Sequence, residues 1–142
     1  MYAVILAGGN GTRLRPLPGT EEPAAFQGTP DGRTLLQQTA ARLAGVVDPM
    51  DVIVVTNRRH GQLVREQLPE ARIVTQPMNR GTATALALVI VSVDRPESET
   101  MIVVNADHEV ELDDAVQQAI TVADQQICGG ALGVERPLVA IS

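Results

Sequence analysis

The chain alternates short, mostly apolar runs with stretches in which apolar positions recur every three or four residues. Apolar runs of four to eight residues are typical of strands buried on both faces of a parallel sheet. The pattern therefore predicts four strands and the start of a fifth, at Tyr2–Ala7, Asp51–Thr56, Arg72–Thr75, Thr100–Asn105 and Gly130–Val134.

The first two predicted helices have clear start signals. Thr34–Leu43 opens with the spacing of a capping box, in which Thr34 and Gln37 satisfy each other's free N–H groups. Gly45 suits the end of this helix. Asn57 is a good N-cap for a second helix, which ends before Pro69.

Two more helices are predicted further along the chain. Gly81–Val93 is apolar nearly all round, which indicates a buried helix. Asp113–Ile127 is amphipathic, because four apolar residues fall on one face, namely Val116, Ile120, Ala123 and Ile127.

Alternating strands and helices predict an α/β fold: a Rossmann-like, three-layer α/β/α sandwich with a mostly parallel sheet and right-handed crossovers. Residues 1–142 form a single predicted domain, with no internal repeat or linker. The stretch Gly8–Arg33 shows neither pattern and holds four prolines. It starts at the carboxyl end of the first strand, where open α/β sheets bind ligands.

The composition excludes some classes of function. The 142 residues are 44% hydrophobic and 20% charged, with a net charge of −6. This acidic balance argues against a nucleic-acid or anionic-membrane binder. No apolar run reaches the roughly 18 residues of a membrane helix, the N-terminus does not resemble a signal peptide, and Cys128 is the single cysteine. We therefore expect a soluble, cytoplasmic protein.

The glycine-rich segment after the first strand is the most informative part of the sequence. Gly8, Gly9 and Gly11 allow close backbone approach to a ligand, and Arg13 and Arg15 add positive charge. The spacing matches neither the dinucleotide fingerprint nor the P-loop, since no lysine follows the glycines. From the residues alone, the segment is either a phosphate-binding loop or a plain turn.

Several motifs in order resemble the sugar-phosphate nucleotidyltransferases, and most closely the mannose-1-phosphate guanylyltransferases. The first covers Ile5–Leu17, which is similar to the family signature. The others follow along the chain, at Pro23–Phe26, Thr34–Thr39, Val54–Asn57, Gln76–Ala83 and Ala106–His108.

This resemblance implies a nucleotide site and a reaction. Arg13 and Asp107 would be catalytic, and Asp107 would hold Mg²⁺, the implied cofactor. From the residues alone, Asp107 could equally be a turn or helix-entry aspartate. The implied partners are a nucleoside triphosphate, GTP, and a sugar 1-phosphate, mannose 1-phosphate, with release of pyrophosphate. The implied nucleotide-binding residues are Leu6, Ala7, Gly8, Gly9, Gly11, Thr12, Arg13, Arg80, Gly81 and Thr82.

The sequence also departs from the family. Ala24 stands where the family has lysine, and the chain contains no lysine. Gly81 and Thr84 replace the usual asparagine and proline. The resemblance extends over about half of a catalytic domain, so we expect a truncated fold, covered by self-association or a partner subunit. Three hypotheses stay open: an active enzyme, a catalytically impaired nucleotide-binding or regulatory module, and a structural remnant.

Overall fold

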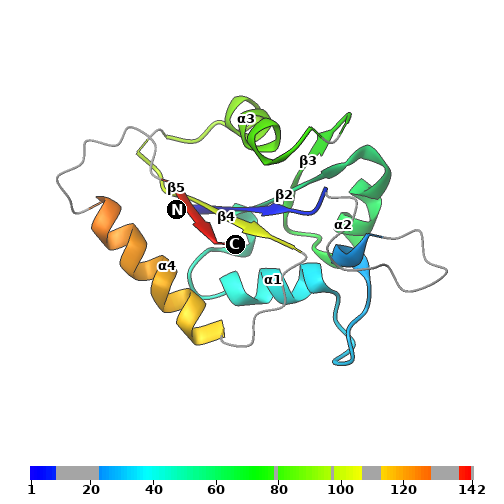
Figure 1. Cartoon of the computed structure of the whole chain (residues 1–142), viewed down its shortest axis with the longest axis horizontal. Helices are drawn as coiled ribbons and strands as arrows, with labels where there is room; N and C mark the ends of the chain where they lie inside the picture. Colours follow the sequence, from blue (N-terminus) through cyan, green and yellow to red (C-terminus); the bar gives the residue numbers. More distant parts are fainter. Residues whose placement is uncertain (9–22, 79, 97, 107–112, 129–137, 142) are drawn as a thin grey trace.

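A parallel five-stranded sheet forms the centre of the computed structural model (Figure 1). The structure describes residues 1–8, 23–78, 80–96, 98–106, 113–128 and 138–141. The strand order is β3-β2-β1-β4-β5, and each neighbouring pair is parallel. The strands are β1 (Tyr2–Leu6), β2 (Val52–Asn57), β3 (Arg72–Gln76), β4 (Met101–Asn105) and β5 (Leu138–Ile141).

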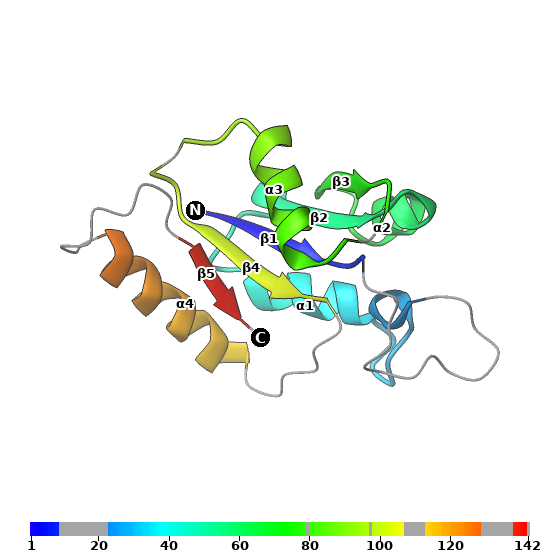
Figure 2. The same ribbon diagram turned by 45° about the horizontal axis from the view of Figure 1, so that its top comes forward.

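Helices cover both faces of this sheet. α1, α2 and α4 lie on one face and α3 on the other (Figures 1 and 2). The helices are α1 (Leu35–Leu43), α2 (Gly61–Gln67), α3 (Thr82–Ser92) and α4 (Asp113–Cys128), with 3-10 turns η1 (Ala24–Phe26), η2 (Pro49–Asp51) and η3 (Arg58–His60). The predicted three-layer α/β/α class is confirmed.

β1, β2 and β4 are apolar along nearly their whole length because both of their faces are buried. Ala3 and Ile5 of β1 join the core under α1, whereas Tyr2 and Val4 join the core under α3. β2 alternates in the same way. An unbroken apolar run was therefore the correct signal for these strands.

The predicted start of α1 is confirmed. Asn57, predicted to cap the second helix, instead caps the 3-10 turn η3, and the N-cap residue of α2 is His60. At the start of α1, the Gln37 backbone N–H donates to Thr34 Oγ1 (3.2 Å) and the Thr34 N–H donates to Gln37 Oε1 (3.0 Å), which completes the capping box. Gly45 follows this helix with a φ of +94°, which favours glycine. Asn57 Oδ1 accepts from the backbone of η3, directly before α2.

The connection through α4 differs from the expected handedness. The connections through α1 and α2 run over one face of the sheet and join β1 to β2 and β2 to β3. The connection through α3 runs over the opposite face and returns from β3 to β4. The connection through α4 joins β4 to β5 and so runs across the sheet in the same direction as the connection through α3. However, α4 packs on the face that carries α1. This crossover therefore has the opposite hand to the other three. Gln117 holds α4 there by donating to the carbonyls of Arg42 and Ala44 (2.9 Å each), and buried Ile120 joins the same core.

Three other expectations change. α3 is not a buried helix: only Ala85 and Val89 are buried, and Val91 is 80% exposed. Among the described residues α3 is the single helix on its face, so its outer side has no cover. The stretch Gly8–Arg33 includes the turn η1. The strand expected from Gly130 lies outside the described residues, and the described fifth strand is β5.

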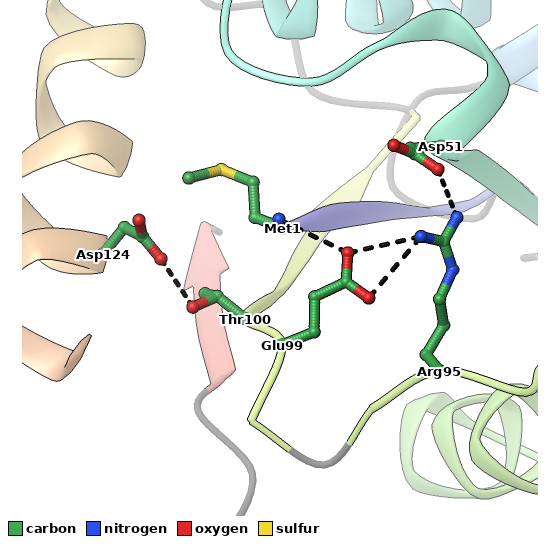
Figure 3. Close-up of polar contacts among 6 residues, drawn as sticks. All are labelled: Met1, Asp51, Arg95, Glu99, Thr100 and Asp124. Atoms are coloured by element: carbon green, nitrogen blue, oxygen red, sulfur yellow. Dashed lines mark hydrogen bonds and ion pairs between the residues drawn. The ribbon is translucent and has the colours of Figure 1, made fainter.

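A cluster of charged groups lies where the strands of the sheet begin, at its amino edge (Figure 3). Arg95 pairs with Asp51, and also with Glu99 at 3.3 Å. The N-terminal ammonium of Met1 lies 3.3 Å from the same Glu99 carboxylate. Because these residues precede different strands, the cluster ties the starts of β1, β2 and β4 together. It is structural, and it lies opposite the edge where ligands bind in such folds.

Candidate nucleotide-binding site

The strand order makes the carboxyl end of β1 a candidate ligand site. From β1 the chain builds the sheet first on one side, through β2 and β3, and then on the other, through β4 and β5. Open α/β sheets bind ligands outside the carboxyl ends of their strands. The glycine-rich segment starts at this point, as the sequence predicted.

The chain leaving β1 lies close against the end of β2. The Ala7 N–H donates to the Val55 carbonyl (2.8 Å), and the fully buried Thr56 hydroxyl donates to the Ala7 carbonyl (3.1 Å). A Cβ built on Gly8 would lie 3.4 Å from Gln76 Oε1 and 3.7 Å from Thr56 Cα. Gly8 therefore lies against the carboxyl ends of β2 and β3.

Gln76 is a site residue that the sequence reasoning missed. Its side chain ends β3 and is only 4% exposed, and its Nε2 finds no hydrogen-bond acceptor among the described atoms. A buried donor without an acceptor costs about 1–3 kcal/mol. Such a group beside a ligand crevice is a candidate donor to a ligand atom. The available signal was a polar residue in the position that ends an apolar strand.

Arg80, Gly81 and Thr82 form the entrance to α3. Gly81 has a φ of +87° and is the N-cap residue, and Thr82 begins the helix. The Arg80 carbonyl accepts from the Thr84 hydroxyl (3.2 Å), and the Arg80 side chain is exposed. The first N–H groups of a helix attract anionic groups. The segment predicted to seat the nucleotide is thus an exposed helix start following β3.

The structure places some of the predicted residues and not others. Leu6 is half-buried, and its carbonyl accepts from the Ala106 N–H (3.1 Å), so the residue before Asp107 lies against the end of β1. Leu6, Ala7 and Gly8 come together with Thr56 and Gln76 as described above. The remaining predicted residues lie outside the described residues: Gly9, Gly11, Thr12, Arg13 and Asp107.

The position expected to carry lysine belongs to a buried turn. Ala24 in η1 is 3% exposed, and the neighbouring Phe26 is equally buried. The Phe26 and His60 rings lie 5.4 Å apart, centroid to centroid, which sets η1 beside η3. A methyl group therefore occupies the place where the family resemblance expects a cation.

No described group of three or more histidine, cysteine or acidic side chains could hold a metal ion. Mg²⁺ needs less than such a cluster, because it is usually held by one or two carboxylates together with phosphate oxygens and waters. In the sequence, Asp107 directly follows Ala106, whose N–H donates to the carbonyl of Leu6 in β1, and one carboxylate would be enough for that donor set. The magnesium assignment to Asp107 remains a proposal.

These features define a class: a Rossmann-like α/β protein whose candidate ligand site adjoins the end of its first strand. The sequence profile of the Nucleotidyl transferase family matches residues 2–137, which is nearly the whole chain. The chain belongs to this family.

Named relatives agree with this assignment. The alginate biosynthesis protein AlgA of Pseudomonas fluorescens is 40% identical over 87% of this chain and 26% of the relative. A mannose-1-phosphate guanylyltransferase of Escherichia coli K12 is 37% identical over 84% of this chain and 27% of the relative. The chain thus spans about a quarter of the length of these relatives.

A solved structure confirms the fold. The chain superposes on a crystal structure named mannose-1-phosphate geranyltransferase, from Thermus thermophilus, with a TM-score of 0.71 and 31% identity. The match covers 86% of this chain and 36% of the other. In the part of the chain that the structure describes, no helix is long and apolar enough to span a membrane.

Proposed function

We propose that the chain binds a nucleoside triphosphate, GTP, at the carboxyl edge of its sheet and transfers the nucleotidyl group to a sugar 1-phosphate, mannose 1-phosphate. The observation that carries the nucleotide site is the buried Gln76 amide beside Gly8, with no acceptor among the described atoms. The family match supports the reaction type, and the E. coli relative's name supports the choice of substrates.

The proposed reaction is a displacement at the α-phosphorus. A phosphate oxygen of the sugar 1-phosphate attacks this atom, a new P–O bond forms, and the bond to the β-phosphate breaks so that pyrophosphate leaves. Catalysis of phosphoryl-type transfer rests on positioning and on neutralising charge. When bound, Mg²⁺ would neutralise phosphate charge.

Each residue has a part in positioning the nucleotide. Gly8 lets the backbone leaving β1 pack against Thr56 and Gln76, and Gln76 donates a hydrogen bond to the nucleotide. The start of α3, with Arg80 and Thr82, faces anionic or polar groups of the ligand. Arg13 would hold the phosphates, and Asp107 would hold Mg²⁺ from the end of β4.

One observation favours a second candidate, a nucleotide-binding module with impaired catalysis. Ala24 is buried and uncharged where the resemblance expects a phosphate-directed lysine. Loss of one preorganised contact to a reacting group commonly lowers the rate by two to three orders of magnitude. This candidate keeps the same nucleotide site but predicts binding without measurable turnover.

Pyrophosphate release distinguishes the two candidates. The purified chain is incubated with Mg²⁺, each of the four common nucleoside triphosphates, and several sugar 1-phosphates. The proposed function predicts release with GTP and mannose 1-phosphate that Asp107→Ala abolishes. Asp114→Ala is the matched control, because Asp114 is exposed on α4. Binding of GTP without release from any pair would contradict the enzyme and favour the binding module.

A further inference from the structure

Two exposed arginines stand at the carboxyl end of β2. Arg58 and Arg59 form η3 directly after the strand, and both side chains are exposed. Neither guanidinium has a hydrogen-bond or ion-pair partner among the described residues. By contrast, Arg95 at the amino edge of the sheet is engaged by two carboxylates.

Three contacts fix η3 beside the candidate site. The Asn57 side chain accepts from the Arg59 and His60 N–H groups and holds the turn on the end of β2. Asn57 is also the register partner of Gln76 on β3. The His60 ring lies against Phe26, so η3 also adjoins η1. The arginine pair therefore directly follows β2. This strand lies between β1, which ends next to Gly8, and β3, which ends in Gln76.

Positive charge at this place needs an explanation, because the chain as a whole carries a net charge of −6. Two neighbouring like charges repel, and no described carboxylate offsets them. Guanidinium groups bind phosphate oxygens through paired hydrogen bonds. A ligand with several phosphate groups would remove both the repulsion and the lack of partners.

We infer that Arg58 and Arg59 form a contact site for the polyphosphate chain of the incoming nucleotide. This inference rests on the proposed function and adds residues that neither the glycine-rich segment nor the α3 entrance contains. The pair raises the local concentration of the anionic nucleotide at the carboxyl edge and holds its phosphates from the side of β2. Its contribution falls as salt rises, because the side chains are exposed.

The test compares charge reversal at two places. The whole chain is titrated with GTP and with inorganic tripolyphosphate, at ionic strengths of about 0.01 M and about 0.15 M. The variant Arg58→Glu/Arg59→Glu is compared with Arg33→Glu/Arg65→Glu, which makes the same change in net charge at two other exposed arginines. Arg58→Lys/Arg59→Lys keeps the charge, and circular dichroism confirms that each variant folds.

We expect the Arg58→Glu/Arg59→Glu variant to bind both ligands about tenfold more weakly at low salt, with a smaller difference at the higher salt. The control should differ by much less, and the lysine variant should retain most of the affinity. Equal weakening in the control would overturn the inference, and so would unchanged binding in the reversed pair. Tripolyphosphate binding through the pair without pyrophosphate release would keep the inference and overturn the proposed enzyme. A chain that binds neither ligand would overturn both.

Discussion

The side-chain amide nitrogen of Gln76 is buried and has no hydrogen-bond acceptor among the described residues. Its Oε1 atom faces Gly8, so the amide is held at the end of β1. Folded proteins rarely bury a donor in this state, and those that do often use it for a ligand. Gln76 thus lowers the free energy of unfolding of the ligand-free protein, and its amide nitrogen is available to donate a hydrogen bond to a bound ligand.

Replacing Gln76 with methionine, Gln76→Met, tests this trade-off. Methionine has nearly the same shape and no donor, so the variant should be about 1 kcal/mol more stable in urea unfolding. Its affinity for GTP should fall, because the directed hydrogen bond is gone. A variant that loses stability and keeps its GTP affinity would show that Gln76 is an ordinary structural residue.

Asp31 gives a prediction about pH. The Thr29 hydroxyl and the Arg33 backbone N–H donate to its carboxylate and hold the pKa of Asp31 below its ordinary value. A carboxyl whose pKa is lower in the folded state stabilises the fold above its unfolded pKa, and this stabilisation is lost as pH falls through the folded pKa. An NMR titration of the Asp31 carboxyl should give a midpoint below that of a free aspartate. In Asp31→Asn, the stability deficit should shrink as the pH falls from the pKa of a free aspartate through that midpoint, and a deficit that is constant with pH would contradict this.

At the scale of elements, α4 is the part whose position the sequence did not determine. Its apolar stripe predicted one buried face but not which side of the sheet would cover it. The structure places buried Ile120 in the core that also contains Leu36 and Leu43 of α1. The Gln117 amide bonds to carbonyls at the end of α1. Side-chain contacts, rather than the usual crossover rule, hold α4 on this face.

Truncation of Ile120 tests whether α4 belongs to this core. Ile120→Ala should destabilise the fold by about 2–5 kcal/mol and Ile120→Val by about 0.5–1.5 kcal/mol, because each opens a cavity. Val122→Ala is the control, since Val122 is 51% exposed, and its effect should stay within about 0.5 kcal/mol. Chemical denaturation measures all three variants. A small effect of Ile120→Ala would mean that α4 does not pack here.

At the scale of the whole molecule, the alternation of elements was enough to predict the layers. Apolar runs predicted β1, β2 and β4, and the capping residue Thr34 predicted the start of α1, whereas Asn57 caps the turn η3 that precedes α2. Periodicity could not reveal that α3 has an exposed outer side, because an all-round apolar helix looks the same whether or not it is covered. Periodicity also could not predict the handedness of the crossover through α4.

The candidate site was predictable only in part. Glycines after a buried strand indicated Gly8, which the structure places against Thr56 and Gln76. The lack of an acceptor for Gln76 Nε2, and the register that pairs Gln76 with Asn57 directly before Arg58, depend on contacts between β1, β2 and β3. Such contacts join residues far apart in the chain, so no local pattern reports them. Arg13 and Asp107 stay predictions.

Another location in the described part of the chain could hold a small ligand. A cavity of about 530 Å³ lies between α1 and the turn that joins α2 to β3, a size that suits a small molecule. Its lining is mostly apolar and includes Ala40, Val47 and Leu68. The charged arginines of η3 and the Gln76 amide lie at the carboxyl edge and do not line this cavity, so the carboxyl edge suits a nucleotide better.

Mapping GTP binding by NMR, amide by amide, is the most direct test of where the nucleotide binds. We predict that the largest shifts among the described residues fall in three segments, residues 6–8, 56–61 and 76–82, which meet at the carboxyl edge. Amides near Arg95 and Glu99, at the amino edge, should change little. If the largest shifts instead surround the cavity beside Val47 and Leu68, or if GTP shifts no amide, the nucleotide site at the carboxyl edge is wrong.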